Sequence, residues 1–293
     1  MSGARGLLLI FAWMAAFLPQ AWAEGPDVQK IWEDGMKAAV NGPSDVPFGD
    51  QAVLHLTGDY FFMPKAEAAA VMVSWGNSIG PGFYGMILPK ADGQRWIMTI
   101  DHTAEGYVQD DDAKSWDAAA LLQSLKDGTE EQNKTRAEMG IKPLEVIGWI
   151  EAPSYDQQSH RLVWSMRLAE RGAAAGEPAT VNYNTYALGR DGYFEMNLIS
   201  DDKSIDSEKQ YARAMLAALE YRAGKGYADF NASTDHIAEY GLAALIAGVA
   251  AKKLGMLALA GVFILKFAKL FIFGAIAFGA GIMKFFRRGK AES

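Results

Sequence analysis

Residues 180–199 decide the fold class, and their sequence is TVNYNTYALGRDGYFEMNLI. Two segments of β character, Thr180–Leu188 and Tyr193–Ile199, flank the turn residues Arg190-Asp191-Gly192. Two such segments joined by a tight turn that contains glycine are typical of an antiparallel hairpin. We therefore expect antiparallel pairing at the centre of the fold.

The rest of the middle region extends this pattern. Further strands are predicted at Val53–Leu56, Phe83–Leu88, Arg95–Val108, Leu144–Glu151 and Arg161–Arg171, with a hairpin turn at Ala91-Asp92-Gly93. Helices are predicted at Asp27–Asn41, Lys65–Val73, Asp110 to about Met139, and Ser207–Tyr221. Because the strands follow one another at short spacing, the sequence predicts an α+β fold with a mostly antiparallel sheet of about six to eight strands and helices packed on it.

The charge is distributed unevenly along the 293 residues, whose formal net charge is −7. Residues 1–23 hold one charged residue, Arg5, and residues 241–293 hold eight basic and one acidic residue, so 24–240 hold 19 basic and 34 acidic residues of the 28 and 35 in total. Phosphate binding requires a basic surface. This acidic balance therefore argues against nucleic acid as a partner.

The first 23 residues have the pattern of a secretory signal peptide. Arg5 precedes an apolar run from Leu7 to Leu18, and Ala21 and Ala23 place small residues before the predicted cleavage site. A helix of this run rises only about 18 Å, which is short of a hydrocarbon core of roughly 30 Å. We expect cleavage after Ala23 and export of residues 24–232 as one acidic α+β domain on the periplasmic side of the inner membrane.

Residues 233–293 are predicted to form a hydrophobic helical membrane anchor with a basic end. The longest uncharged runs, Leu254–Leu265 and Leu270–Met283, have 12 and 14 residues. Joined, they exceed the roughly 20 residues that a transmembrane helix needs. On a helical wheel with about 100° per residue, six basic residues fall in one narrow stripe and Lys253 lies outside it. The members of this basic stripe are Lys252, Lys266, Lys269, Lys284, Arg287 and Arg288.

Three arrangements of this segment remain open. A single span leaves Lys266 and Lys269 near mid-membrane, which costs about 5–7 kcal/mol on insertion scales. A hairpin returns Arg287 and Arg288 to the periplasm, against the positive-inside rule. A helix that lies in the interface turns the stripe toward anionic head groups. We favour the span, with membrane lipid and protein partners, or self-association through small residues of the helix, as its contacts.

Catalytic motifs are weak. Residues Gly76 to Gly80 match G-x-S-x-G, but a nucleophile elbow needs a strand before the serine and a helix after it, and here the predicted order is the reverse. Asp101-His102 with Glu105 nearby resembles an acid–base pair. Adjacent residues of a strand, however, point to opposite faces, which favours a surface or edge position for His102.

Metal and cofactor motifs are weaker still. The four histidines, His55, His102, His160 and His236, lack metal-ligand spacing. Asp110–Asp112 resembles half of a calcium loop, but acidic residues at a helix start account for it. The chain has no cysteine, which excludes disulfides, thiol nucleophiles and thiolate zinc sites. We predict no cofactor and no metal.

A set of short motifs resembles a known bacterial family. The motifs are Tyr60–Lys65, Trp149 with Pro153 and Tyr155-Asp156, Leu162 with Trp164, Asn182-Tyr183, Leu188–Arg190, Tyr227–Phe230 and Tyr240–Leu245. The chain is similar in these to uncharacterised membrane-anchored proteins that share a domain of unknown function. The resemblance implies a bacterial envelope protein with an exported domain and a C-terminal anchor, and it supplies no activity, substrate or catalytic residue.

Two classes of function therefore stay open. The sequence favours a non-enzymatic binding or assembly module that faces the periplasm. The alternative is an envelope hydrolase whose carboxylates the fold brings together, because paired Asp or Glu side chains cleave glycosidic bonds.

Overall fold

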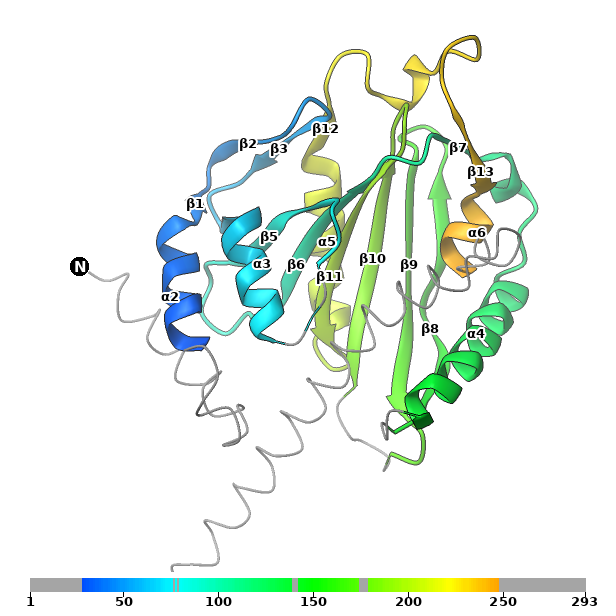
Figure 1. Cartoon of the computed structure of the whole chain (residues 1–293), viewed down its shortest axis with the longest axis horizontal. Helices are drawn as coiled ribbons and strands as arrows, with labels where there is room; N and C mark the ends of the chain where they lie inside the picture. Colours follow the sequence, from blue (N-terminus) through cyan, green and yellow to red (C-terminus); the bar gives the residue numbers. More distant parts are fainter. Residues whose placement is uncertain (1–27, 76, 78, 139–141, 174–178, 248–293) are drawn as a thin grey trace, which may run out of the picture.

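The computed structural model describes residues 28–75, 77, 79–138, 142–173 and 179–247. Its centre is an eight-stranded sheet (Figure 1). Across the sheet the strands are β1 (Val40–Asn41), β4 (Tyr60–Pro64), β5 (Phe83–Pro89), β6 (Ile97–Thr103), β11 (Tyr193–Asp201), β10 (Thr180–Leu188), β9 (Arg161–Glu170) and β8 (Leu144–Asp156).

Every pair of neighbouring strands in this sheet is antiparallel. In the hairpin of β10 and β11, Leu188 pairs with Tyr193 and Asn184 pairs with Asn197. Gly192 closes the turn, where a Cβ would come within 1.9 Å of the Thr103 carbonyl oxygen, so only glycine fits. The predicted α+β class, the antiparallel sheet and this hairpin are confirmed.

One face of the sheet is covered by apolar packing. The helix α5 (Ile205–Ala218) lies behind β10 and β11 in Figure 1. A second sheet in the order β12 (Leu219–Tyr221), β3 (Ala52–Leu56) and β2 (Ser44–Phe48) contributes to the same core. We call this side the apolar face. Its buried side chains on the central strands are Met98, Ile100, Val181, Tyr183, Ala187, Phe194, Met196 and Leu198.

The opposite face carries helices at its two ends. The helices α2 (Val28–Ala38) and α3 (Lys65–Ser74) pack over β4 and β5, where Met63, Phe83 and Met86 are buried. At the other end lie α4 (Ala118–Glu138) and α6 (Leu242–Ala247), which pack with Leu162 and Trp164 of β9 (Figure 1). We call this side the polar face, because polar residues occupy its middle, as described below.

The packed part of the chain continues past residue 232, at which the sequence predicts the end of the domain. The strand β13 (Ile237–Gly241) pairs in parallel with β7 (Tyr107–Gln109). The helix α6 follows, and the Asp112 carboxylate accepts hydrogen bonds from the backbone N–H groups of Leu242 and Ala243 at 3.3 and 2.9 Å. Residues 237–247 therefore form part of the domain body.

The predicted helix from Asp110 is wrong over its first residues. Residues Asp111–Lys114 form a short 3₁₀ helix (η2), and α4 begins only at Ala118. The Asp117 carboxylate accepts a hydrogen bond from the Ala119 N–H at 2.7 Å, so Asp117 is the residue that caps α4. The acidic run resembles a helix start, but two of its carboxylates serve other contacts. Asp110 accepts a hydrogen bond from the Tyr155 hydroxyl, and Asp112 accepts hydrogen bonds at the start of α6.

Four further elements differ from the predictions. Tyr60–Pro64 is a strand of the central sheet that the sequence pattern misses, and Ser44–Phe48 is a second missed strand. The predicted helix Ser207–Tyr221 begins at Ile205, and its last three residues form β12. The predicted strand Arg95–Val108 is divided between β6 and β7, because Gly106 turns the chain between them with φ at 98°.

Several predictions fall outside the described residues. They are the signal peptide, the basic stripe of Lys252, Lys266, Lys269, Lys284, Arg287 and Arg288, and the Gly76 and Ser78 positions of G-x-S-x-G. Within the described ranges, none of the helices combines the length and apolar character needed to cross a bilayer.

Candidate functional site

Four loops meet at one edge of the central sheet, which lies at the top of Figure 1. They are residues 104–106, the hairpins 157–160 and 189–192, and the segment 222–236. Backbone hydrogen bonds join them, including Gly106 N–H to Asp191 O at 3.0 Å, Arg190 N–H to Lys225 O at 2.9 Å and Leu188 N–H to His160 O at 2.9 Å. We call this region the upper edge. Its loops form a connected platform.

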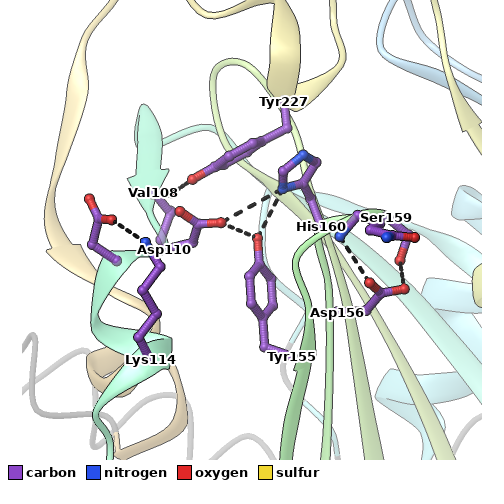
Figure 2. A network of polar contacts seen from close by, with 10 residues as sticks. Val108, Asp110, Lys114, Tyr155, Asp156, Ser159, His160 and Tyr227 are labelled. Atoms are coloured by element: carbon purple, nitrogen blue, oxygen red, sulfur yellow. Dashed lines mark hydrogen bonds and ion pairs between the residues drawn. The ribbon is translucent and has the colours of Figure 1, made fainter.

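A cluster of aromatic and ionisable side chains lies under one half of the upper edge (Figure 2). The Tyr155 hydroxyl donates a hydrogen bond to Asp110 Oδ2 at 2.7 Å, and it lies 3.1 Å from His160 Nδ1. The His160 ring stacks on Tyr227 with 4.2 Å between centroids. Tyr227 in turn donates to the Val108 carbonyl oxygen at 2.9 Å. We call Asp110, Tyr155, His160 and Tyr227 the tyrosine cluster.

The backbone of the 157–160 hairpin is shaped to place His160 in this cluster. The Asp156 carboxylate accepts hydrogen bonds from the Gln158 N–H at 2.9 Å and the Ser159 hydroxyl at 2.7 Å, which folds the turn. His160 then has a positive φ of 53°, a conformation that few residues other than glycine adopt. A backbone conformation this uncommon indicates that contacts with the surrounding structure hold His160 in place.

The chemistry of the tyrosine cluster is that of a structural network. Burial, with the Asp110 carboxylate as a second cause, raises the pKa of Tyr155 far above its usual value. Burial also raises the pKa of Tyr227, and the Tyr107 hydroxyl adds to this effect. Both phenols therefore stay protonated and act as donors, while Asp110 and the Val108 carbonyl accept. The network positions loops and offers no activated nucleophile.

A hollow opens over the other half of the upper edge. Its volume is about 740 Å³. The residues that line it are Ala104, Glu105, Gly106, Arg190, Asp191, Gly224, Lys225, Asp235, His236, Glu239 and Tyr240. We call this the acidic hollow, because four carboxylates face two basic side chains. Gly106 lies in its wall, where a Cβ would come within 2.7 Å of the His236 carbonyl oxygen.

The basic groups of the hollow are already paired. Arg190 forms a bidentate ion pair with Asp235, with distances of 2.7 Å from Nε to Oδ2 and 2.9 Å from Nη2 to Oδ1. This pair lowers the pKa of Asp235 and raises that of Arg190. Lys225 pairs with Asp50 at 2.9 Å. In the part of the chain that the structure describes, Asp191 and Glu239 form no such ion pair, so they leave the hollow with negative charge.

The histidines singled out from the sequence lie in four separate environments. His55 sits on β3 between Asp45 and Glu220, at 2.7 and 3.1 Å. His160 belongs to the tyrosine cluster, and His236 lines the hollow. Among the described residues, no three His, Cys, Asp or Glu side chains are grouped in a way that could hold a metal ion.

The prediction of a surface or edge position for His102 is wrong. Its ring is half-buried against Phe194, with 4.6 Å between centroids, and this burial lowers the pKa of His102. The reason is that β6 lies inside the sheet, between β5 and β11. The alternation argument itself holds, since Asp101 pairs across the strands with Glu195 on the polar face while His102 faces the apolar side.

The helix–loop–strand context of G-x-S-x-G is the one that the sequence predicts. The helix α3 ends at Ser74 before the motif, and β5 begins at Phe83 after it. A nucleophile elbow requires the opposite order. The described part of this loop is tied to the helix, because the Asn77 side chain donates to the Met72 carbonyl oxygen at 3.1 Å.

The tyrosine cluster and the acidic hollow were not predicted from the sequence. Their members come from segments far apart in the chain, so no local spacing joins them. One signal did mark part of them, since Tyr155-Asp156, Leu188–Arg190, Tyr227–Phe230 and Tyr240 are among the motifs that carry the family resemblance.

The chain belongs to a family described as protein of unknown function (DUF2167), whose model matches residues 40–279. This match confirms the resemblance to an uncharacterised family. No curated protein matches the chain.

Solved structures show weak similarity. Cyanobacterial PsbP (CyanoP) from Synechocystis sp. PCC 6803 aligns with 8% identity over 61% of this chain and 92% of its own, with a TM-score of 0.37. LpqN, described as involved in cell envelope biogenesis of Mycobacterium tuberculosis, aligns with 12% identity over 62% of this chain and 88% of its own, with a TM-score of 0.30.

Proposed function

We propose that this protein is a non-enzymatic binding or assembly module of the bacterial envelope, held at the inner membrane by its C-terminal segment, and that its acidic hollow binds a basic segment of a partner protein. The observation that carries the proposal is the charge of the hollow. Arg190 and Lys225 are neutralised by Asp235 and Asp50, while Asp191 and Glu239 remain available to a cation.

The form of the hollow supports a protein partner. Its floor and walls come from loops that hydrogen-bond to one another, so the surface is largely formed before binding. Exposed carboxylates at the rim of an interface attract and orient a basic partner, and they contribute more to encounter rate and specificity than to affinity. The Tyr240 hydroxyl, which donates to Glu105, holds one of these carboxylates in place.

The membrane location rests on the sequence. Residues 1–23 have the pattern of a signal peptide, and the segment after Ala247 is apolar with a basic end. The family match extends to residue 279 and so includes most of this apolar segment. A periplasmic domain with a cytoplasmic basic end is the arrangement that these features favour.

A peptide titration tests the hollow directly. The full-length protein in detergent is titrated with a fluorescent decapeptide that alternates lysine and alanine, and anisotropy is measured at low and high salt. We expect binding that weakens with salt, and the Asp191→Asn/Glu239→Gln variant should bind roughly three- to tenfold more weakly, since an exposed ion pair contributes about 0.2–1 kcal/mol.

A matched control keeps the total charge equal. Asp59→Asn/Asp92→Asn removes two exposed carboxylates at the opposite edge of the sheet, where the Lys90 N–H donates to the Asp59 carbonyl oxygen at 2.9 Å. This variant should bind the peptide like the parent protein. Equal weakening by both variants would mean that net charge alone attracts the peptide, and the proposal would fail.

A partner is then sought with the same pair of variants. Full-length protein with a C-terminal tag is crosslinked mildly in membranes, and the proteins captured with it are identified. A partner that is captured by the parent and the control variant, and lost from Asp191→Asn/Glu239→Gln, supports the proposal. A set of captured proteins that is identical for all three contradicts it.

One observation favours the hydrolase alternative. Asp101 on β6 and Glu195 on β11 are direct cross-strand partners, so their carboxyl groups come from neighbouring positions on one face. They are 9% and 5% exposed and do not line the hollow. Release of soluble sugar from peptidoglycan, abolished by both Asp101→Asn and Glu195→Gln, would establish the enzyme and displace the binding module.

A further inference from the structure

Four aromatic rings form a stacked column beside the acidic hollow. Tyr107 stacks on Phe230 with 3.9 Å between ring centroids and on Tyr227 with 4.3 Å, at interplanar angles of 20° and 27°. Tyr227 stacks in turn on His160 at 4.2 Å and 30° (Figure 2). Because a ring accepts one parallel neighbour on each face, the order is Phe230, Tyr107, Tyr227 and His160. We call these four residues the aromatic column.

The two ends of the aromatic column lie in different surroundings. At one end, His160 is held inside the tyrosine cluster, where its Nδ1 lies 3.1 Å from the Tyr155 hydroxyl. At the other end, Phe230 is partly exposed, and it belongs to none of the four buried apolar clusters of the described residues. Tyr107 covers one face of its ring. The outer face of Phe230 is therefore the end of the column that a ligand can reach.

Hydrogen bonds attach this end of the column to the wall of the acidic hollow. The Tyr107 N–H donates to the carbonyl oxygen of His236, which lines the hollow, at 2.8 Å. Phe230 directly precedes Asn231, whose N–H donates to Oδ2 of Asp235, another lining residue, at 2.7 Å. The Asp235 N–H donates back to the Asn231 carbonyl oxygen at 2.9 Å. The same loop therefore positions the Phe230 ring and part of the hollow.

Negative charge lies next to the partly exposed ring. Asp229 directly precedes Phe230, is exposed, and accepts a hydrogen bond from the Gly226 N–H at 2.9 Å. It forms no ion pair with another residue that the structure describes, so it keeps its negative charge. Between described residues, the cation that lies over an aromatic ring is Lys90, whose Nζ is 4.9 Å from the centroid of Phe61. The Phe230 ring is therefore left for a cation from outside the domain.

We propose that Phe230 and Asp229 form a subsite for an arginine side chain, so that the acidic hollow selects a basic segment that contains arginine over one that contains lysine. This inference rests on the proposed function, because it specifies which basic partner the same site takes. A guanidinium group is planar, stacks on aromatic faces and presents a fork of N–H donors to a carboxylate. A lysine ammonium is a compact and strongly hydrated charge, so it gains less from the same two groups.

The rest of the column holds the Phe230 ring in place before a ligand binds. Tyr107 lies behind Phe230, and Tyr227 lies behind Tyr107 with its hydroxyl donating to the Val108 carbonyl oxygen at 2.9 Å. A ring that is already fixed loses little conformational entropy when a ligand stacks on it. Packing in the apolar core accounts for Tyr227, which is buried, but it does not account for the partly exposed Phe230. A stacking role does.

Two peptides of equal charge test the subsite. The full-length protein in detergent is titrated with fluorescent decapeptides that alternate alanine with either arginine or lysine, and anisotropy is measured. We expect the parent protein to bind the arginine peptide roughly two- to fivefold more tightly. Phe230→Leu keeps apolar bulk but removes the aromatic face, so it should abolish this preference and leave the affinity for the lysine peptide unchanged. Phe230→Trp should keep or increase the preference, because tryptophan is the best cation–π partner.

Phe61→Leu is the matched control, because Phe61 is also partly exposed but Lys90 already lies over its ring, and it should retain the arginine preference. Asp229→Asn keeps an acceptor for the Gly226 N–H, should narrow the preference, and serves if Phe230→Leu does not fold. Equal affinity of the parent for both peptides, or equal loss of both in Phe230→Leu, would overturn the subsite and leave the role of the hollow intact. If the parent binds neither peptide, the proposed function fails and this inference with it.

Discussion

The two faces of the central sheet are both buried, but they are built from different chemistry. On the apolar face, Phe194 is 0% exposed and its ring lies 5.6 Å from that of Phe48 and 5.7 Å from that of Tyr221. On the polar face, the next residue along β11 is Glu195, which is 5% exposed. A single strand therefore presents an aromatic core on one side and buried polar side chains on the other.

The difference between the two faces shows that alternation of polar and apolar residues along a strand does not identify the solvent-exposed face of a sheet. In an antiparallel sheet, alternating polar and apolar residues normally mean that one face is solvated. Here Asn182 and Asn184 alternate with Tyr183 and Thr185, yet all four are at most 7% exposed. Both sets of side chains are buried, one polar and one apolar, and the predictions below test how differently they contribute to stability.

The largest expected effect comes from the apolar face. Phe194→Ala should lower the free energy of unfolding by about 3–5 kcal/mol, since it removes a buried ring and leaves a cavity. Asn197→Ala, the residue three positions along the same strand, should cost only about 1 kcal/mol, the usual net value of a hydrogen bond. Urea unfolding followed by circular dichroism measures both. Equal losses of unfolding free energy in the two variants would contradict the difference proposed between the two faces.

The second largest loss of stability is expected at the upper edge, where the tyrosine cluster and the acidic hollow can be compared. Tyr155→Phe removes the donor to Asp110, and a hydrogen bond to a charged group contributes about 1.5–3 kcal/mol to the free energy of unfolding. Tyr240→Phe removes the donor to the exposed Glu105 in the acidic hollow and should cost less than about 1 kcal/mol. Thermal and urea unfolding of the two variants would contradict this ranking if Tyr240→Phe were the more destabilising.

Much of the fold was accessible from the sequence because it depends on local patterns. Turn residues such as Arg190-Asp191-Gly192 and the alternation of Thr180–Leu188 are encoded within a few positions, and the antiparallel sheet follows from them. Tyr60–Pro64 was missed because it ends at a proline and runs directly into a helix. Leu219–Tyr221 was missed because three residues carry too little periodicity to separate them from the preceding helix.

The candidate sites depend on tertiary pairing and were not accessible in this way. Asp110, Tyr155 and Tyr227 are separated by tens of residues, and only the loops of the upper edge bring them together. Asp112 illustrates the same limit, because a carboxylate that resembles a helix start caps α6, which lies 130 residues further along the chain. Sequence spacing cannot reveal contacts of this range.

A pH-dependent effect is expected at a buried carboxylate on the apolar side of the sheet. Glu208 of α5 accepts a hydrogen bond from Ser200 of β11, and burial raises the pKa of Glu208. Because the folded pKa is raised, the folded state is favoured while Glu208 is protonated, and this contribution is lost as pH rises through the folded pKa. Glu208→Gln should therefore gain stability relative to the parent as pH rises from about 4 to 7. Melting temperatures that differ by the same amount at both pH values would contradict this.

The smallest effect is expected outside both faces, at His55 on the exposed side of β3. Hydrogen bonds to Asp45 and then to Glu220 raise the pKa of His55. A raised folded pKa means that the contribution of His55 to stability is present below its unfolded pKa of about 6.5 and is lost as pH rises through the folded value. His55→Gln should therefore lower the melting temperature more at pH 5.5 than at pH 8.5, and the difference should shrink in high salt, because all three side chains are exposed. A difference that grows with pH would instead mean that neutral His55 is the form that joins β2, β3 and β12, and that packing rather than charge holds this small sheet together.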